Sequence, residues 1–353
     1  MISNIENTKI NSNKFNDDKL SFHINNTNND IDISFVNSIR RNIEENLDGF
    51  IIDNIKFIKN TTIFSNDLIL QRLKMLPYIY SIVNKYDLTK LVIKLNINNN
   101  GLYPIKIDTN NLEFYYENNK IDNFISYDKI LLLSNVYPND IINFEFSLKK
   151  TTINEYIDNE INHYPSIKYT CQNVYVFKDD EDEVNKLIKE QNITDEKEKI
   201  NFRLSNLIYK KNKFGKPSTY IYNLESNGIM SCKETLIKSI NLLIGKIKRI
   251  IDLCDKDGEY IEIFNSHNNP NISIITFLNE THTIGNLFSN YFSQNNMLEY
   301  CSYHIPHPLI NKLQVKLTYK DVSENKRSNT VKIIKDECSK LISLYEEFIS
   351  FFL

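Results

Sequence analysis

Three histidines near the carboxyl end of the chain carry the side chains best suited to chemistry. His282 could act as a general base, and His304 and His307 lie three residues apart, a spacing that metal ligands can have. The metal interpretation lacks support, because these two histidines lie in a proline-flanked stretch without a nearby cysteine or carboxylate cluster to complete a ligand shell. We therefore expect the histidines to be structural.

The alternative role for His282 is a place at the start of a helix. Thr281 or Thr283 could supply an N-cap oxygen, and Gly285 would permit the backbone of a neighbouring element to approach closely. These residue types suit capping and packing better than acid–base chemistry. We expect no catalytic residue in this segment.

The densest group of carboxylates, residues 179–183, lies in the polar stretch 178–199, which we expect to be a solvated loop or linker. The chain also lacks a GxxxxGK[ST] phosphate loop, a GxSxG nucleophile turn, an HExxH zinc motif and a DxDxD metal triad. The sequence therefore predicts no catalytic residue, no cofactor and no metal site.

Composition narrows the class of protein further. The 353-residue chain has 42 Lys and Arg against 45 Asp and Glu, whereas a surface that clamps nucleic acid needs a basic excess. Its five cysteines are scattered without a CxxC pair, so neither a disulfide framework nor a zinc ribbon is indicated. Apolar runs fall far below the roughly 20 residues that span a bilayer, and the polar amino end has no signal-peptide core. We expect an intracellular protein that does not contact membranes.

The first half of the chain predicts one helix and many short strands. Apolar residues at three- and four-residue steps predict a helix over 34–47 with Ser34 as its N-cap. Alternation of apolar and polar residues predicts a strand over 50–59. Short strands separated by Asn-rich turns follow between residues 61 and 165 and indicate a separate β-rich unit.

The pattern of apolar residues after residue 165 predicts two modules with a related order of strands and helices. The first continues with strands at 169–177, 201–210 and 218–226 and a long helix at 232–253. The second has strands at 260–264 and 272–278, a helix at 282–295, a strand at 313–319 and a long helix at 329–352. Each long helix has an apolar seam that suits a partner helix, so we expect each to pack on the other or on the neighbouring module's short helix. A short tether raises the effective concentration to roughly the millimolar range, which favours pairing within the chain.

Two segments of the second module carry a specific pattern, NETHTIGNLF over residues 279–288 and YHIPHPL over residues 303–309. They resemble the small α-like subunit of multisubunit RNA polymerases, the archaeal L and eukaryotic eleventh subunit, which carries HTLGN at a helix start and a downstream Y-x-x-P-H-P-L. Ile284 replaces the leucine of that pattern, a volume-conserving change. The resemblance implies a set of dimerisation-motif residues: His282, Thr283, Gly285, Asn286, Tyr303, Pro306, His307 and Pro308.

Three earlier segments resemble the larger α-like partner, archaeal D and the eukaryotic third subunit. They are NSIRR over residues 37–41, the stretch 68–77, and YIYNLESNG over residues 220–228. The chain would then be a natural fusion of two subunits, of the kind that large DNA viruses encode. Larger-subunit relatives often hold a cysteine-ligated zinc or iron–sulfur site in an inserted domain. Residues 61–165 contain no cysteine, so we expect that site to be absent.

The same resemblance implies a docking surface for the second-largest, catalytic-side polymerase subunit. Its expected members are Asn37, Arg40, Arg41 and, on weaker grounds, Arg72. Arginine suits such contacts because its planar fork engages carboxylates through two hydrogen bonds. The alternative for the arginines is an internal salt bridge or plain solvated charge.

The expected fold class is α/β (α+β), an RNA polymerase α-like dimerisation domain with a β-rich insert, fused to a second, smaller module. The expected units are a disordered tail (1–19), a dimerisation domain (20–60 with 166–254), the insert (61–165) and the second module (258–353). The implied function is a non-catalytic assembly platform that docks the two largest polymerase subunits, associates with other small subunits, and meets DNA only through the complex. The implied location is a viral factory in the host cytoplasm and the virion, or the nucleus. The alternative is a stand-alone α-like module that binds regulators or virion components.

Overall fold

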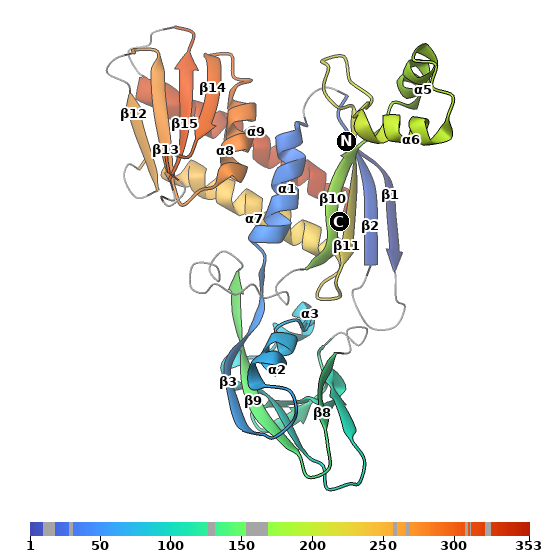
Figure 1. Cartoon of the computed structure of the whole chain (residues 1–353). Helices are drawn as coiled ribbons and strands as arrows, with labels where there is room; N and C mark the ends of the chain where they lie inside the picture. Colours follow the sequence, from blue (N-terminus) through green and yellow to red (C-terminus); the bar gives the residue numbers. More distant parts are fainter. Residues whose placement is uncertain are drawn as a thin grey trace.

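The computed structural model describes most of the chain and shows a mixed α+β architecture. The described residues are 1–9, 18–27, 31–125, 131–152, 169–256, 260–265, 269–307, 310, 312–321 and 326–353. Figure 1 shows two α/β modules above a third, mainly β body. Among the described helices, none is long and apolar enough to cross a membrane.

The N-terminal module is a four-stranded antiparallel sheet with two helices. Its elements are β1 (Ile2–Lys9), β2 (Asp18–Asn25), α1 (Ile33–Glu45), β10 (Thr170–Phe177), β11 (Thr219–Ser226) and α7 (Cys232–Leu253), and the strand order is β1-β2-β11-β10. The predicted disordered tail over residues 1–19 is wrong for β1, which pairs along β2. Backbone hydrogen bonding to a neighbouring strand orders this polar segment, and its composition gave no sign of that.

Local signals explain where the two helices of this module begin. Asp32, rather than the expected Ser34, is the N-cap of α1, because the Asp32 side chain accepts a hydrogen bond from the Ser34 backbone N–H at 3.0 Å. At the start of α7, Ser231 and Glu234 form a reciprocal capping box. The bounds of α7 agree with the prediction for 232–253.

The acidic stretch forms two helices and not the expected loop. These are α5 (Glu181–Glu190) and α6 (Glu196–Ser205), so the strand predicted over 201–210 is also wrong. Three acidic residues occupy the first turn of α5, where the helix dipole favours negative charge, and Asp180 caps it. The run of carboxylates is therefore a helix-start signal.

The C-terminal module repeats the plan of the first. Its elements are β12 (Ile261–Asn265), β13 (Ile272–Leu278), α8 (His282–Phe292), β14 (Leu298–His304), β15 (Lys312–Tyr319) and α9 (Lys326–Ser350), in strand order β12-β13-β15-β14. The sequence did not predict β14, whose last residue, His304, begins the proline-flanked stretch. Without the insert and α5–α6, both modules read ββαββα, and both sheets place the fourth strand between the second and the third.

One hydrophobic core joins the two modules. Helix α7 packs on α9, and α1 packs on both α7 and α8. From α9, the Phe348 ring lies 6.0 Å from Phe22 of β2 and 5.7 Å from Phe35 of α1, centroid to centroid. The Tyr345 ring stacks on Phe35 at 4.5 Å, and its hydroxyl lies 2.6 Å from Ser38 Oγ.

The β-rich insert has its own hydrophobic core, which is formed by buried residues from the stretch 50–148 of the chain. Its strands are β3 (Asp48–Asn60), β4 (Leu91–Asn98), β5 (Ile105–Asp108), β6 (Glu113–Tyr116), β7 (Asn119–Ile121), β8 (Leu132–Val136) and β9 (Ile141–Thr152), with helices α2 (Asn66–Leu73) and α3 (Tyr80–Val83). The larger sheet has the order β3-β9-β4-β6-β7. The strand predicted over 50–59 therefore belongs to the insert and not to the dimerisation domain, because β3 pairs with β9.

Candidate functional site

The start of α8 holds the first part of the expected dimerisation motif. Thr281 occupies the N-cap position in an extended conformation, but its side chain makes no capping hydrogen bond. The Thr283 hydroxyl is buried and also has no hydrogen-bond partner. The expectation that one of these threonine oxygens caps the helix is therefore wrong. The backbone turns into the helix through Asn279, which adopts a left-handed φ of 60°.

Gly285 joins the two parts of the motif. A Cβ atom at this position would lie 2.6 Å from Leu313 Cδ1 and 2.9 Å from Tyr303 Cε2, which is closer than real side chains approach. Because glycine has no Cβ, α8 can lie directly against β14 and β15. This is the close backbone approach that the sequence predicted, and it explains why Gly285 and Tyr303 occur together.

Of the remaining motif residues, His282 lies against this contact. The His282 ring is exposed and packs edge-to-face with Tyr303, with 5.8 Å between the ring centroids. Pro306 and His307 are exposed, and Pro308 lies outside the described residues. Throughout the described part of the chain, no group of three or more His, Cys, Asp or Glu residues could hold a metal ion.

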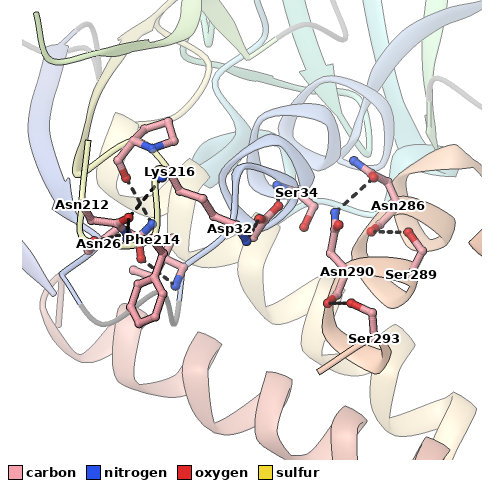
Figure 2. Close-up of polar contacts among 12 residues, drawn as sticks. Asn26, Asp32, Ser34, Asn212, Phe214, Lys216, Asn286, Ser289, Asn290 and Ser293 are labelled. Atoms are coloured by element: carbon pink, nitrogen blue, oxygen red, sulfur yellow. Dashed lines mark hydrogen bonds and ion pairs between the residues drawn. The ribbon is translucent and has the colours of Figure 1, made fainter. Parts of the chain in front are cut away.

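The solvent-facing side of α8 is polar but uncharged. Asn286 accepts a hydrogen bond from Asn290 Nδ2 at 3.2 Å, and the hydroxyls of Ser289 and Ser293 donate to the carbonyls of Asn286 and Asn290 at 3.1 and 2.7 Å (Figure 2). These bonds run along one helix and leave the amide and hydroxyl groups near the surface. The motif residue Asn286 thus belongs to a surface rather than to the core.

A loop of the N-terminal module holds the amino end of α1. Lys216 Nζ lies 2.9 Å from the N-cap carboxylate of Asp32, which is almost fully buried (Figure 2). Asn212 shapes this loop, since its Oδ1 accepts from the backbone N–H groups of Phe214 and Lys216, and its Nδ2 donates to the Asn26 carbonyl at 3.1 Å. The loop therefore fixes the helix that carries the expected docking residues.

Asn37, Arg40 and Arg41 lie together on α1, and both arginines have partners within the helix. Arg40 Nε donates to Asn37 Oδ1 at 3.0 Å, and its Nη1 lies 3.3 Å from Glu44. Arg41 donates through Nε and Nη2 to Glu45 Oε1 at 3.0 and 2.8 Å. Each arginine side chain stays about 30% exposed, so these are partly screened surface ion pairs. The geometry matches the salt-bridge alternative and leaves docking as a proposal.

Arg72 is not brought to this surface by the fold. It lies on α2 of the insert, where its guanidinium carbon lies 5.0 Å from the centre of the Phe64 ring and its Nη1 donates to the Leu132 carbonyl. Both contacts lie within the insert. Arg72 therefore connects α2 to β8, and its geometry adds nothing to the docking surface on α1.

Sequence reasoning missed a charged cluster where the insert meets the N-terminal module. The Asp48 carboxylate lies 2.7 Å from Lys150 Nζ, forms an ion pair with Lys238, and accepts a hydrogen bond from the Tyr80 hydroxyl at 3.0 Å. The sequence predicted a helix over 34–47 and a strand over 50–59, and assigned no contact to Asp48 between them. No local pattern could have identified the cluster, because its members come from four separate elements.

A comparison with family models finds one similarity, in the C-terminal module. Residues 273–350 match the RNA polymerase Rpb3/Rpb11 dimerisation domain, a range that runs from β13 to the end of α9. A search of curated proteins found no match to the chain. Domains of the matched type belong to non-catalytic polymerase subunits. The C-terminal part of the chain is therefore similar to the RNA polymerase Rpb3/Rpb11 dimerisation domain.

Proposed function

We propose that this chain is a non-catalytic assembly-platform subunit of a DNA-directed RNA polymerase. The C-terminal module takes the part of the small α-like subunit, and the N-terminal module takes the part of the larger one. The two pair within one chain and dock the two largest subunits, which hold the catalytic chemistry. The chain itself positions these subunits and contributes no catalytic side chain.

The observation that carries this proposal is the repeated architecture of the two modules. Residues 273–350 match the dimerisation-domain family, and the N-terminal module has the same ββαββα order and the same strand order. The two modules also bury one common core, in which equivalent helices meet: α1 meets α8, and α7 meets α9. A pair of like modules that share a core is what an intramolecular α-like dimer requires.

The pairing contacts resemble an obligate interface rather than a transient one. Phe22, Phe35, Tyr345 and Phe348 are fully buried between the modules, and Phe348 lies edge-on to the first two rings. Obligate interfaces resemble a domain core cut in half, with aromatic anchors and few charges. Neither module would present this surface to solvent without cost.

The proposed docking surface for a large subunit is the exposed side of α1 around Arg40 and Arg41. Both guanidinium groups are held in place by Glu44 and Glu45, yet about a third of each arginine remains open to solvent. A preorganised arginine loses less side-chain entropy when it meets a carboxylate on a partner.

Affinity purification of the tagged chain from its native expression context tests the function. We expect two much larger chains in stoichiometric amounts, together with promoter-independent RNA synthesis. Substituting Arg40→Ala with Arg41→Ala should lower recovery of one large chain by about tenfold or more, whereas Lys94→Ala, in the insert, should not. Recovery of the chain alone, without a large subunit at any salt concentration, would contradict the proposal and favour a stand-alone interaction protein.

A split chain tests the pairing separately. Residues 1–256 and 260–353, co-expressed as two chains, should associate one to one, because the described inter-module contacts do not depend on the connection between them. Phe348→Ala should weaken that association strongly, since it removes a fully buried aromatic anchor. Two halves that stay soluble and separate would refute the pairing.

A further inference from the structure

The insert and the paired modules have separate hydrophobic cores. No core residue of the insert belongs to the core that the two modules share. Among the described residues, Tyr80 is the one side chain that packs against both cores. Bodies with separate cores and a small common interface move relative to each other unless specific contacts hold them.

The contacts that could hold the insert converge on Asp48, the first residue of β3. Its carboxylate lies 2.7 Å from Lys150 Nζ of β9 and contacts Lys238 Nζ of α7. The Tyr80 hydroxyl donates to the same carboxylate at 3.0 Å, and the Tyr169 hydroxyl donates to the Asp48 carbonyl. One residue is therefore bound by both bodies at once.

Lys238 provides the link to the pairing helix. Its Nζ lies 3.6 Å from the centre of the Tyr80 ring and 5.5 Å from that of Tyr169, so the ammonium group contacts two aromatic rings. The backbone N–H of Tyr80 also donates to the Ile229 carbonyl, just before α7, at 2.9 Å. Because α7 packs on α9, the orientation of the insert is tied to the helix that pairs the modules.

The charge state of this group favours a tight contact at neutral pH. Burial alone would raise the pKa of Asp48, but the ion pairs with Lys150 and Lys238 outweigh burial and lower the pKa to about 2. The titratable groups that face Asp48 are those two lysines with Tyr80 and Tyr169. The carboxylate therefore stays ionised between two cations.

We propose that Asp48, Lys150, Lys238 and Tyr80 form a clasp that fixes the orientation of the insert on the paired modules. The clasp joins two independently cored bodies and is not needed to fold either of them. Its loss releases the insert to turn about the chain segments that connect it. The clasp acts within the single chain, whether or not the chain assembles into a polymerase.

Distance measurements between spin labels on the full chain test the clasp. The labels are placed at Leu102→Cys in the insert and Tyr300→Cys on β14, which are 87% and 60% exposed, in a Cys171→Ser background because Cys171 is exposed. We expect a narrow distance distribution in the parent protein. Asp48→Asn and Lys238→Met should each broaden it by about twofold, and the double variant should broaden it no further.

A matched control and two contrary outcomes make the test decisive. Lys248, like Lys238, lies on α7, and Lys248→Met removes its exposed ion pair with Glu346 of α9. This variant should leave the distance distribution unchanged. Far-UV circular dichroism should show both bodies folded in every variant. An unchanged distribution in Asp48→Asn and Lys238→Met would overturn the proposal. Loss of either core in these variants would also overturn it, because the cluster would then support folding rather than orientation.

Discussion

The two modules share one plan but differ in how continuous that plan is along the chain. In the C-terminal module the six elements follow one another from β12 to α9. In the N-terminal module the insert separates α1 from β10, and α5 with α6 separates β10 from β11. The family model matches residues 273–350, within the continuous module. The likeness of the interrupted module to the continuous one is seen in its element order and strand order.

The equivalent helices α1 and α8 differ in a second way. Helix α1 presents two arginine–glutamate pairs to solvent, whereas α8 presents asparagine and serine side chains whose hydrogen bonds stay within the helix. The two equivalent helices therefore offer different chemistry at their surfaces. Under the proposed function, this difference would let the two modules distinguish two partners without any change of fold.

The largest expected effect breaks the core that the modules share. Phe348→Ala should lower the free energy of unfolding by about 3–5 kcal/mol, because a fully buried aromatic ring leaves a cavity between Phe22 and Phe35. Phe351→Ala, three residues further along, is the control, since Phe351 is 41% exposed and should cost less than about 1 kcal/mol. Chemical denaturation measures both, and equal losses would contradict a core that joins the modules.

Two glycines, one in each module, should respond in opposite directions. Gly285→Ala places a methyl group 2.6 Å from Leu313 Cδ1 and should destabilise the protein by about 1–3 kcal/mol. Gly245→Ala on α7 meets no atom within 4 Å and should stabilise it by up to about 1 kcal/mol through helix propensity. Thermal melts of both variants check the signs. A neutral Gly285→Ala would mean that the contact between α8 and β14 is loose.

The junction between the N-terminal module and the insert should be sensitive to acid. The pKa of Asp48 falls from 3.8 to about 2 on folding, so its stabilising contribution is complete above about pH 4 and is lost as the pH falls from 4 to 2. After allowance for partial exposure, we expect about 1–2 kcal/mol, measured as the pH dependence of unfolding. Asp48→Asn should flatten the curve across this window. A variant that keeps the wild-type slope would contradict the assignment.

The smallest expected change in the free energy of unfolding tests whether the surface of α1 is charged and that of α8 uncharged. Arg40→Ala or Arg41→Ala should change the free energy of unfolding by only about 0.3–0.5 kcal/mol, because both ion pairs are exposed pairs four residues apart on a helix. Added salt should shrink that change. Asn290→Ala on α8 should show no salt dependence, since its contact with Asn286 is uncharged. Urea titrations at low and high salt make the comparison.

Long amphipathic segments were predictable because their signals are local. The bounds of α7 follow from apolar residues at steps of three and four and a capping box at Ser231. The need for Gly285 in a close contact was also readable, although its partners Tyr303 and Leu313 became evident only in the structure. The edge strand β1 was missed because its order comes from pairing with β2. The helices α5 and α6 were missed because charge density was taken for solvation when it marks a helix start.

The candidate site also has features that the sequence predicted and features that only the structure showed. The residue types of the docking and dimerisation motifs were evident in the sequence, but their partners were not. Arg72 makes its contacts within the insert, whereas Arg40 is held on α1. The Asp48 cluster could not be foreseen, because contacts between distant elements leave no periodic trace in the sequence.

By itself, the sequence determined the periodic elements, the balanced charge and the local motif at the start of α8, because each depends on neighbours a few residues away. Only the tertiary structure decided which strands share a sheet, that β3 joins the insert, and that two modules bury one core. Those outcomes depend on contacts between residues far apart in the chain. Their free energy comes from burying apolar surface that no single segment can cover alone.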